Sequence, residues 1–252
     1  MAVFEVNGAS VFAAGGGLTD RSRPAVVMLH GAGMDHRVWI WCCRALVQRG
    51  RRVLAVDLPA HGRSGGPPLA RIDALADWLI GLLDAAAIDR AGLAGHSLGA
   101  LIALDAAARH PGRVHALALV GAALRMPVHP KLLAAAHDDL PAAVALMMRW
   151  SRGDEPEAAL RSDRRLIDAA PGVLSAGLAA CDAYQQGDER ARAVRCPAIV
   201  VAGTHDRMTP MEGARALAAA IPAAQIAPIE GAGHMLPLTA PRHTLAALAC
   251  VL

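Results

Sequence analysis

The segment 91–104 constrains the fold more than any other part of the chain. It starts with small apolar residues typical of a buried strand, passes through the pentapeptide G-H-S-L-G at 95–99, and continues as an apolar run typical of a buried helix. A strand that turns directly into a helix strains the residue at the turn and leaves room only for glycine two positions away on either side. The pattern predicts that Ser97 stands above the carboxyl end of a strand, beside free N–H groups of the next helix.

Strand and helix patterns alternate along most of the chain. Continuous apolar runs predict strands that are covered on both faces at 25–29, 53–56, 116–120 and 198–202, and a further strand is predicted at 225–229. Helical spacing of apolar residues marks 35–50, 72–87, 212–220 and 241–251. An Asn7-Gly8 turn predicts that 4–6 and 10–13 pair as an antiparallel hairpin. The predicted fold class is therefore α/β, with a mostly parallel, doubly wound sheet of about eight strands whose first pair is the hairpin.

The alternation is interrupted from residue 124 to residue 192. This stretch lacks strand-like runs, and its helical pieces are separated by prolines at 127, 130, 141, 156 and 171. Met147 and Trp150 lie at helical spacing within it, as in helices that cover a neighbouring surface. We predict a core made of 1–123 and 193–252, and a helical cap made of 124–192 that is inserted after the sixth strand and directs Met147 and Trp150 towards a substrate pocket.

Polar residues follow four of the predicted parallel strands, and the carboxyl ends of such strands meet at one edge of a sheet. A serine hydroxyl is a weak nucleophile near neutral pH, so it needs a base, and the base needs a carboxylate that fixes its tautomer. Histidine is the natural base because its pKa lies near 7. The chain offers Ser97 at the strand–helix turn, then Asp206 after a later strand, then His234 in a glycine-rich loop. Their order is the one expected for an α/β-hydrolase.

With these motifs the chain resembles the α/β-hydrolase fold family over essentially its full length, and it is similar to the capped, esterase-like serine hydrolases of that family. The resemblance implies that Ser97 is the nucleophile, Asp206 the acid and His234 the base. It also implies an oxyanion hole formed by the backbone N–H groups of Ala32 and Leu98.

For several methionines and histidines, the sequence indicates a role less specifically than it does for Ser97, Asp206 and His234. Met235 follows His234 and is the best pocket candidate among the methionines, whereas the sequence predicts core positions for Met148, Met208 and Met211. Among the other histidines, His205 is predicted to pack, His96 to point away from the side of Ser97, and two to brace loops, namely His30 and His61.

The favoured interpretation is a hydrolase of carboxylic esters with a small to medium, largely uncharged acyl group, acting through an acyl-serine. A carbon–carbon bond hydrolase, a lactonase, a cofactor-free haloperoxidase-like enzyme or a transferase would use the same triad. Serine at the turn argues against the dehalogenases and epoxide hydrolases of the family, which use aspartate. The alternative outside enzymes is a non-catalytic, ligand-binding relative, and such relatives often lose a triad residue.

Composition limits the cellular compartment and the kinds of partner that we expect. No apolar run among the 252 residues reaches about 18, and the first residues lack a basic region followed by a long apolar core, so we expect neither a transmembrane helix nor a signal peptide. The five cysteines have no metal-type spacing and are expected to be reduced in the cytoplasm. The net charge is +3, but basic and acidic residues alternate, as at 161–165, which favours a solvated helix face over nucleic-acid binding. We expect a small-molecule substrate as partner, no metal or cofactor, and leave a homodimer open.

Overall fold

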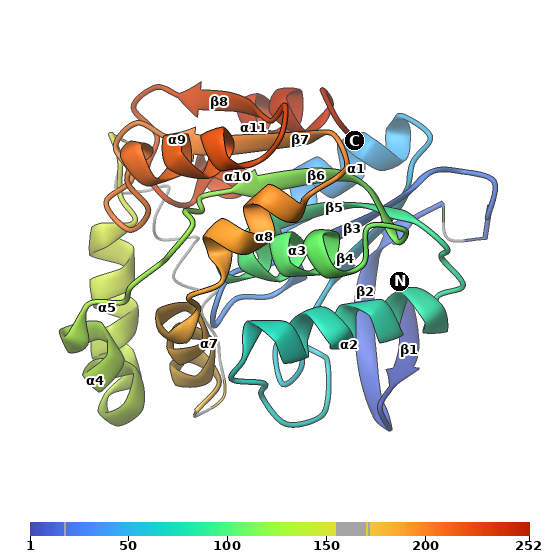
Figure 1. Ribbon diagram of the computed structural model, residues 1–252. Helices are drawn as coiled ribbons and strands as arrows, with labels where there is room; N and C mark the ends of the chain where they lie inside the picture. Colours follow the sequence, from blue (N-terminus) through green and yellow to red (C-terminus); the bar gives the residue numbers. More distant parts are fainter. Residues whose placement is uncertain (18, 155–169, 171) are drawn as a thin grey trace.

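An eight-stranded sheet forms the centre of the computed structural model, which describes residues 1–17, 19–154, 170 and 172–252. The strand order is β1-β2-β4-β3-β5-β6-β7-β8 (Figure 1). The strands are β1 (Ala2–Val6), β2 (Ala9–Gly16), β3 (Ala25–Leu29), β4 (Arg52–Val56), β5 (Ala91–His96), β6 (Val114–Val120), β7 (Ala198–Gly203) and β8 (Gln225–Ile229). Pairing is parallel from β4 to β8, whereas β2 is antiparallel to both β1 and β4. The predicted fold class is confirmed.

Helices cover both faces of the sheet. One face carries the 3-10 helix η1 (His36–Trp39), α1 (Ile40–Gln48), α10 (Leu236–Thr239) and α11 (Pro241–Leu248). The other face carries α2 (Ile72–Ala85), α3 (Leu98–Arg109), α8 (Gly187–Ala193) and α9 (Met211–Ala220). In Figure 1, α2, α3 and α8 lie in front of the sheet. Because β3, β4, β5 and β7 are covered on both sides, every residue of these four strands is buried, which explains their unbroken apolar runs.

The N-terminal hairpin extends further than the sequence indicated. Asn7 and Gly8 both have positive φ, at 52° and 77°, as the predicted tight turn requires. The second strand does not stop at residue 13: Gly15 and Gly16 continue it and pair with β4. A Cβ on Gly15 would collide with the carbonyl of Val53, so glycine here permits a close backbone approach rather than a loop.

Four described helices lie between β6 and β7. α4 (Pro130–Asp138) packs against α5 (Leu140–Trp150) and α7 (Val173–Ala183), and Figure 1 shows these three beyond the end of the sheet. The fourth, α8, packs against α3 and α9. The division into a core and a cap at 124–192 stays a prediction, and the stretch 161–165 lies outside the described residues.

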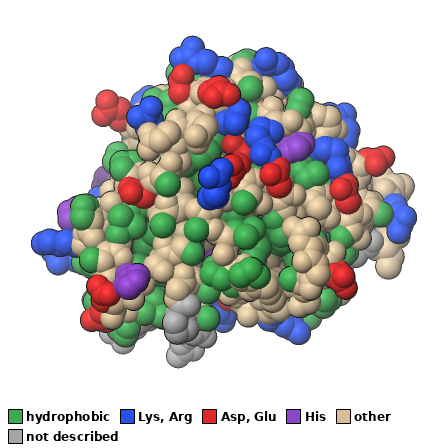
Figure 2. Space-filling view, turned by 60° about the horizontal axis from the view of Figure 1, so that its bottom comes forward, with side chains coloured by type: hydrophobic (Ala, Val, Ile, Leu, Met, Phe, Trp, Pro, Cys, Tyr) green, Lys and Arg blue, Asp and Glu red, His purple; other side chains and the backbone are tan. Residues whose placement is uncertain are grey.

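The surface carries charges of both signs. On the face shown in Figure 2, basic and acidic side chains lie intermixed, and apolar side chains are scattered among them. None of the described helices combines the length and the apolar character that a membrane crossing requires.

Candidate active site

The turn between β5 and α3 has the strained geometry that the pentapeptide predicts. Ser97 has φ 54° and ψ −117°, a left-handed backbone for a residue that is not glycine. A Cβ on Gly95 would collide with the backbone of Gly99, and a Cβ on Gly99 would collide with the carbonyl of Leu29. Both glycines therefore let the helix start directly on top of the strand, which lifts Ser97 to the carboxyl edge of the sheet.

His234 and Asp206 form a buried pair at the same edge. Nδ1 of His234 lies 2.8 Å from Oδ2 of Asp206, and the two side chains are 4% and 0% exposed. Burial acts to raise the pKa of Asp206, but the neighbouring His234 and the hydrogen bonds from His234 and Thr209 outweigh it, so the pKa lies below its usual value. The carboxylate is thus ionised at neutral pH and pairs with Nδ1 of the imidazole, while Nε2 has no hydrogen-bond partner among the described residues.

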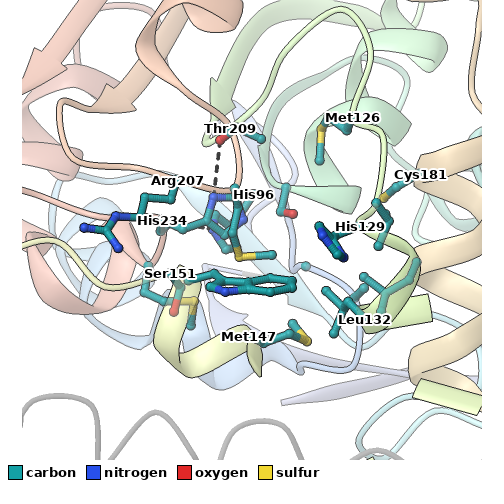
Figure 3. Close-up of a pocket in the computed structure, with 18 of the residues that line it drawn as sticks. His96, Met126, His129, Leu132, Met147, Ser151, Cys181, Arg207, Thr209 and His234 are labelled. Carbon is teal, nitrogen blue, oxygen red and sulfur yellow. Dashed lines mark hydrogen bonds between the residues drawn. The ribbon is translucent and has the colours of Figure 1, made fainter. Parts of the chain in front are cut away.

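Thr209 is a member of this site that the sequence analysis missed. Its hydroxyl donates to Oδ2 of Asp206 at 2.6 Å and lies 3.3 Å from Nδ1 of His234, the contact drawn as a dashed line in Figure 3. The other oxygen of Asp206, Oδ1, accepts the backbone N–H groups of Met208 and Thr209. A threonine three residues after the aspartate was the available signal, because short turns of this kind are closed by aspartate side chains.

Two backbone N–H groups remain available beside Ser97. Leu98 is the first residue of α3, so its N–H has no partner within the helix. The N–H of Ala32 donates no hydrogen bond within the described part of the chain. A Cβ built on Gly177 of α7 would lie 3.0 Å from Cβ of Ala32 and 3.2 Å from a methyl group of Leu98, so these two residues are neighbours in space.

His96 occupies a different place from the one predicted. It lines the same pocket as Ser97 instead of pointing away from it, and its Nε2 donates to the backbone carbonyl of His234 at 2.9 Å. The sequence could not show this contact because the two residues are 138 positions apart. By contrast, His30 and His61 do brace loops: their Nε2 atoms accept the N–H groups of Leu58 and Gly33.

Burial keeps these histidines neutral, and this predicts acid sensitivity of the fold. Burial lowers the pKa of His96 to about 3, and that of His30 likewise. In the unfolded chain the pKa is about 6.5, so below that pH the unfolded state binds protons that the folded state does not. Stability should therefore fall as pH drops below about 6.5, by about 1.4 kcal/mol per pH unit for each such histidine.

Thermal melts from pH 7 to pH 5 check this expectation. His96→Gln keeps a donor for the carbonyl of His234, and it should show a shallower loss of melting temperature than the wild type. The exposed His243→Gln is the matched control and should keep the wild-type slope. Equal slopes in all three proteins would contradict a buried, neutral His96.

The pocket in front of Ser97 is mostly apolar. Met147, Trp150 and Met235 all line it, as does Ala32. The prediction of core positions was wrong for Met148 and Met208, and in total six of the nine methionines line the pocket: Met34, Met126, Met147, Met148, Met208 and Met235. Figure 3 shows Met126, Leu132 and Cys181 on one side and His234 with Arg207 on the other. Burial raises the pKa of Cys181 to about 12, so this thiol stays protonated and unreactive.

One group of described side chains has the spacing of a metal site, namely Asp35, His36 and Asp57. Its oxygens already serve the fold. Oδ1 of Asp57 accepts the backbone N–H and Nδ1 of His36, and Oδ2 accepts the N–H of Arg63. Asp35 caps η1 through the N–H of Arg37. These three side chains therefore fix the loops that follow β3 and β4.

A model of the alpha/beta hydrolase family matches residues 26–248. The chain belongs to the alpha/beta hydrolase family. A pimeloyl-[acyl-carrier protein] methyl ester esterase from Aromatoleum aromaticum is 32% identical, over 84% of this chain and 92% of its own length. A dihydrolipoyllysine-residue acetyltransferase component of an acetoin cleaving system from Pseudomonas putida is 33% identical over 85% of this chain, which spans 60% of that protein's length. The enol-lactonase from Burkholderia xenovorans has a similar structure, with a TM-score of 0.89 and 26% identity over 99% of this chain and 98% of its own.

In this alpha/beta hydrolase, the end of α5 is joined to the loop that carries His234. The backbone N–H of His234 donates to the carbonyl of Ser151 at 2.7 Å, and the N–H of Asp154 donates to the carbonyl of Gly231 at 2.8 Å. A Cβ on Gly233 would collide with the carbonyl of Ser151, so only glycine allows the two segments to lie so close.

A side-chain pair reinforces this junction. Nδ1 of His205 lies 2.9 Å from Oδ1 of Asp154, and both side chains are largely exposed. The prediction that His205 packs was wrong: the residue is exposed, and its imidazole instead contacts Asp154 at the surface. Residues 151–154 thus hold the position of the His234 loop through these two backbone hydrogen bonds.

Proposed function

We propose that this alpha/beta hydrolase is an enzyme that cleaves carboxylic esters through an acyl-serine at Ser97. The observation that carries the proposal is the buried His234–Asp206 pair, which opens onto the same pocket as a serine held at a strained strand–helix turn. Structural packing alone accounts for neither the positive φ of Ser97 nor a fully buried ion pair beside it.

The proposed reaction has two halves. Nε2 of His234 takes the proton from the Ser97 hydroxyl as its oxygen attacks the ester carbonyl, and Asp206 stabilises the resulting imidazolium. The N–H groups of Leu98 and Ala32 donate to the oxyanion. The imidazolium then returns the proton to the departing alcohol, which leaves acyl-Ser97, and a water repeats the sequence to release the acid. Contacts between nucleophile and base are often long in free enzymes and shorten in the substrate complex.

The pocket favours a small or medium, uncharged acyl group. Its volume is about 120 Å³. An engineered apolar cavity of about 150 Å³ holds one benzene molecule, so an acyl chain of a few carbons fits on the side lined by Met126, Leu132 and Cys181. The helices α4, α5 and α7 supply much of this lining, which supports the proposed assignment of 124–192 as a cap.

A fluorophosphonate probe tests the proposal directly, because it forms a covalent bond only with an activated serine. The wild type should be labelled at Ser97, and a panel of esters and lactones of graded acyl length should be turned over. Lactones belong in the panel because a lactone is an internal ester that the same triad would open. Absence of both labelling and turnover would favour a non-catalytic, ligand-binding protein.

The cap residues should select acyl length. Trp150 packs 5.3 Å from the ring of His129, and Met147 lies one helical turn before Ser151. Trp150→Ala or Met147→Ala enlarges the pocket, so the ratio of kcat/KM for long and short acyl chains should rise by about tenfold, or roughly 1.4 kcal/mol. Leu146→Ala, on the same helix but outside the pocket lining, is the matched control. Equal effects on all chain lengths would make Trp150 and Met147 core residues.

A further inference from the structure

The described residues that line the pocket include a permanently charged cation but no carboxylic acid. Five of the described residues that line it have titratable side chains, and none of the five is a carboxylic acid: His96, His129, Cys181, Arg207 and His234. Arg207 alone among them carries a permanent charge. The wall that meets a substrate therefore combines an apolar interior with a single fixed cation.

The position of Arg207 is fixed by its neighbours, while its side chain is free to meet a ligand. It lies between Asp206, which pairs with His234, and Met208, whose N–H is held by Asp206. The guanidinium group makes no hydrogen bond or ion pair within the described ranges, and the residue is exposed. The carboxylate of Asp154 pairs with His205, two residues before Arg207.

The location of Arg207 indicates which portion of an ester, acyl or alcohol, it would contact. Figure 3 shows Arg207 beyond His234, on the side of the pocket opposite Leu132 and Cys181. His234 must reach the departing alcohol to return its proton, so the alcohol portion of an ester lies on the His234 side. The acyl portion then occupies the apolar side. The guanidinium group extends past His234 and away from Leu132 and Cys181, so it would meet the far end of the alcohol portion rather than the reacting carbonyl (Figure 3).

We propose that Arg207 binds an oxyanion, carboxylate or phosphate, on the alcohol portion of the substrate. This proposal rests on the ester hydrolysis proposed above and names its substrate class: an uncharged acyl group joined to an anionic alcohol. A guanidinium presents two parallel N–H groups that match the two oxygens of such an anion, and it binds them more strongly than a neutral donor would. The contact is made at the rim, where solvent weakens it, so its effect is on selectivity rather than on the chemical step.

The test compares butyrate esters that differ only in the alcohol. The alcohols are 3-hydroxypropanoate, 3-hydroxypropyl phosphate and the neutral 3-hydroxypropanamide. In the wild type, kcat/KM for the anionic esters should exceed that for the amide by about fivefold at low salt, and the excess should shrink as salt is added. Arg207→Gln should bring the ratio to about one, and Arg207→Glu below one. The exposed Arg215→Gln on α9 is the matched control and should keep the wild-type ratio.

The outcomes separate this proposal from the one on which it rests. Ser97-dependent hydrolysis of the amide ester with no anion preference, or a preference that survives Arg207→Gln, overturns the role of Arg207 and leaves ester hydrolysis standing. A preference for monomethyl succinate, whose anion is on the acyl side, over methyl butyrate overturns the assignment of the two ends. A wild type that is not labelled by the fluorophosphonate and cleaves no ester removes both proposals. The carboxylate and phosphate arms show which oxyanion is preferred.

Discussion

Replacing Ser97 with alanine should lower kcat for every ester that the protein cleaves by on the order of 10⁶, the loss seen when a serine hydrolase loses its nucleophile. The remaining His234–Asp206 pair has no serine oxygen to activate, and any residual rate reflects binding and the oxyanion donors. The fold should survive, because the Ser97 side chain makes no capping hydrogen bond to α3 and alanine meets the same backbone strain.

The measurement combines kcat with a melting temperature and probe labelling. Ser175→Ala, a half-buried serine on α7 that does not line the pocket, is the matched control and should keep full activity and labelling. A clean preparation of Ser97→Ala that hydrolyses esters within tenfold of the wild type would show that another group is the nucleophile. Activity lost together with the folded state would instead assign Ser97 to the stability of the turn.

The fold could be predicted because its signals are local. Glycines flank Ser97 because a Cβ at either position would collide with backbone of the turn or of a neighbouring strand end. The Asn7-Gly8 pair likewise indicates a turn of two residues. Unbroken apolar runs report burial on both faces. Each of these can be read from a few neighbouring letters, which is why the strand boundaries agree closely with the structure except where β2 continues through Gly16.

The pocket could not be predicted in the same way, because its walls come from distant segments. His96 is oriented by the carbonyl of His234, and the His234 loop is in turn held by the backbone of Ser151. Helical spacing shows that Met148 has an apolar environment but cannot show whether that environment is a core or a cavity. Thr209 differs from these, since its distance of three residues from Asp206 was visible in the sequence.

The structure shows that the two oxygens of Asp206 have different partners, and this sharpens what Asp206→Asn should do. Oδ1 accepts two backbone N–H groups, and Oδ2 accepts Nδ1–H of His234 and the hydroxyl of Thr209. An asparagine that keeps its oxygen on the backbone side preserves the turn before α9. Its amide nitrogen then faces His234 as a donor, so the imidazole must carry its proton on Nε2, where it can no longer accept one from Ser97.

The pH dependence of stability offers an independent check on the charge of Asp206. Its pKa is lower in the folded protein than the ordinary value, so the ionised group adds stability that is present above the unfolded pKa, about 4, and is lost as pH falls through the folded value. Asp206→Asn lacks this contribution. The variant should therefore lose less stability than the wild type when pH falls below about 4, whereas its turn should hold at neutral pH.

In kinetics, Asp206→Asn should lower kcat by about 10⁴, the penalty found for the same change in a related triad. Thr209→Val is the matched variant: it removes one hydrogen bond to Oδ2 but keeps the charge, so it should cost far less than Asp206→Asn and leave the tautomer unchanged. If Asp206 only closed the turn, Asp206→Asn would instead keep a near-normal rate and lose roughly 0.5–2 kcal/mol of stability. A rate within threefold of the wild type would mean that another carboxylate serves His234.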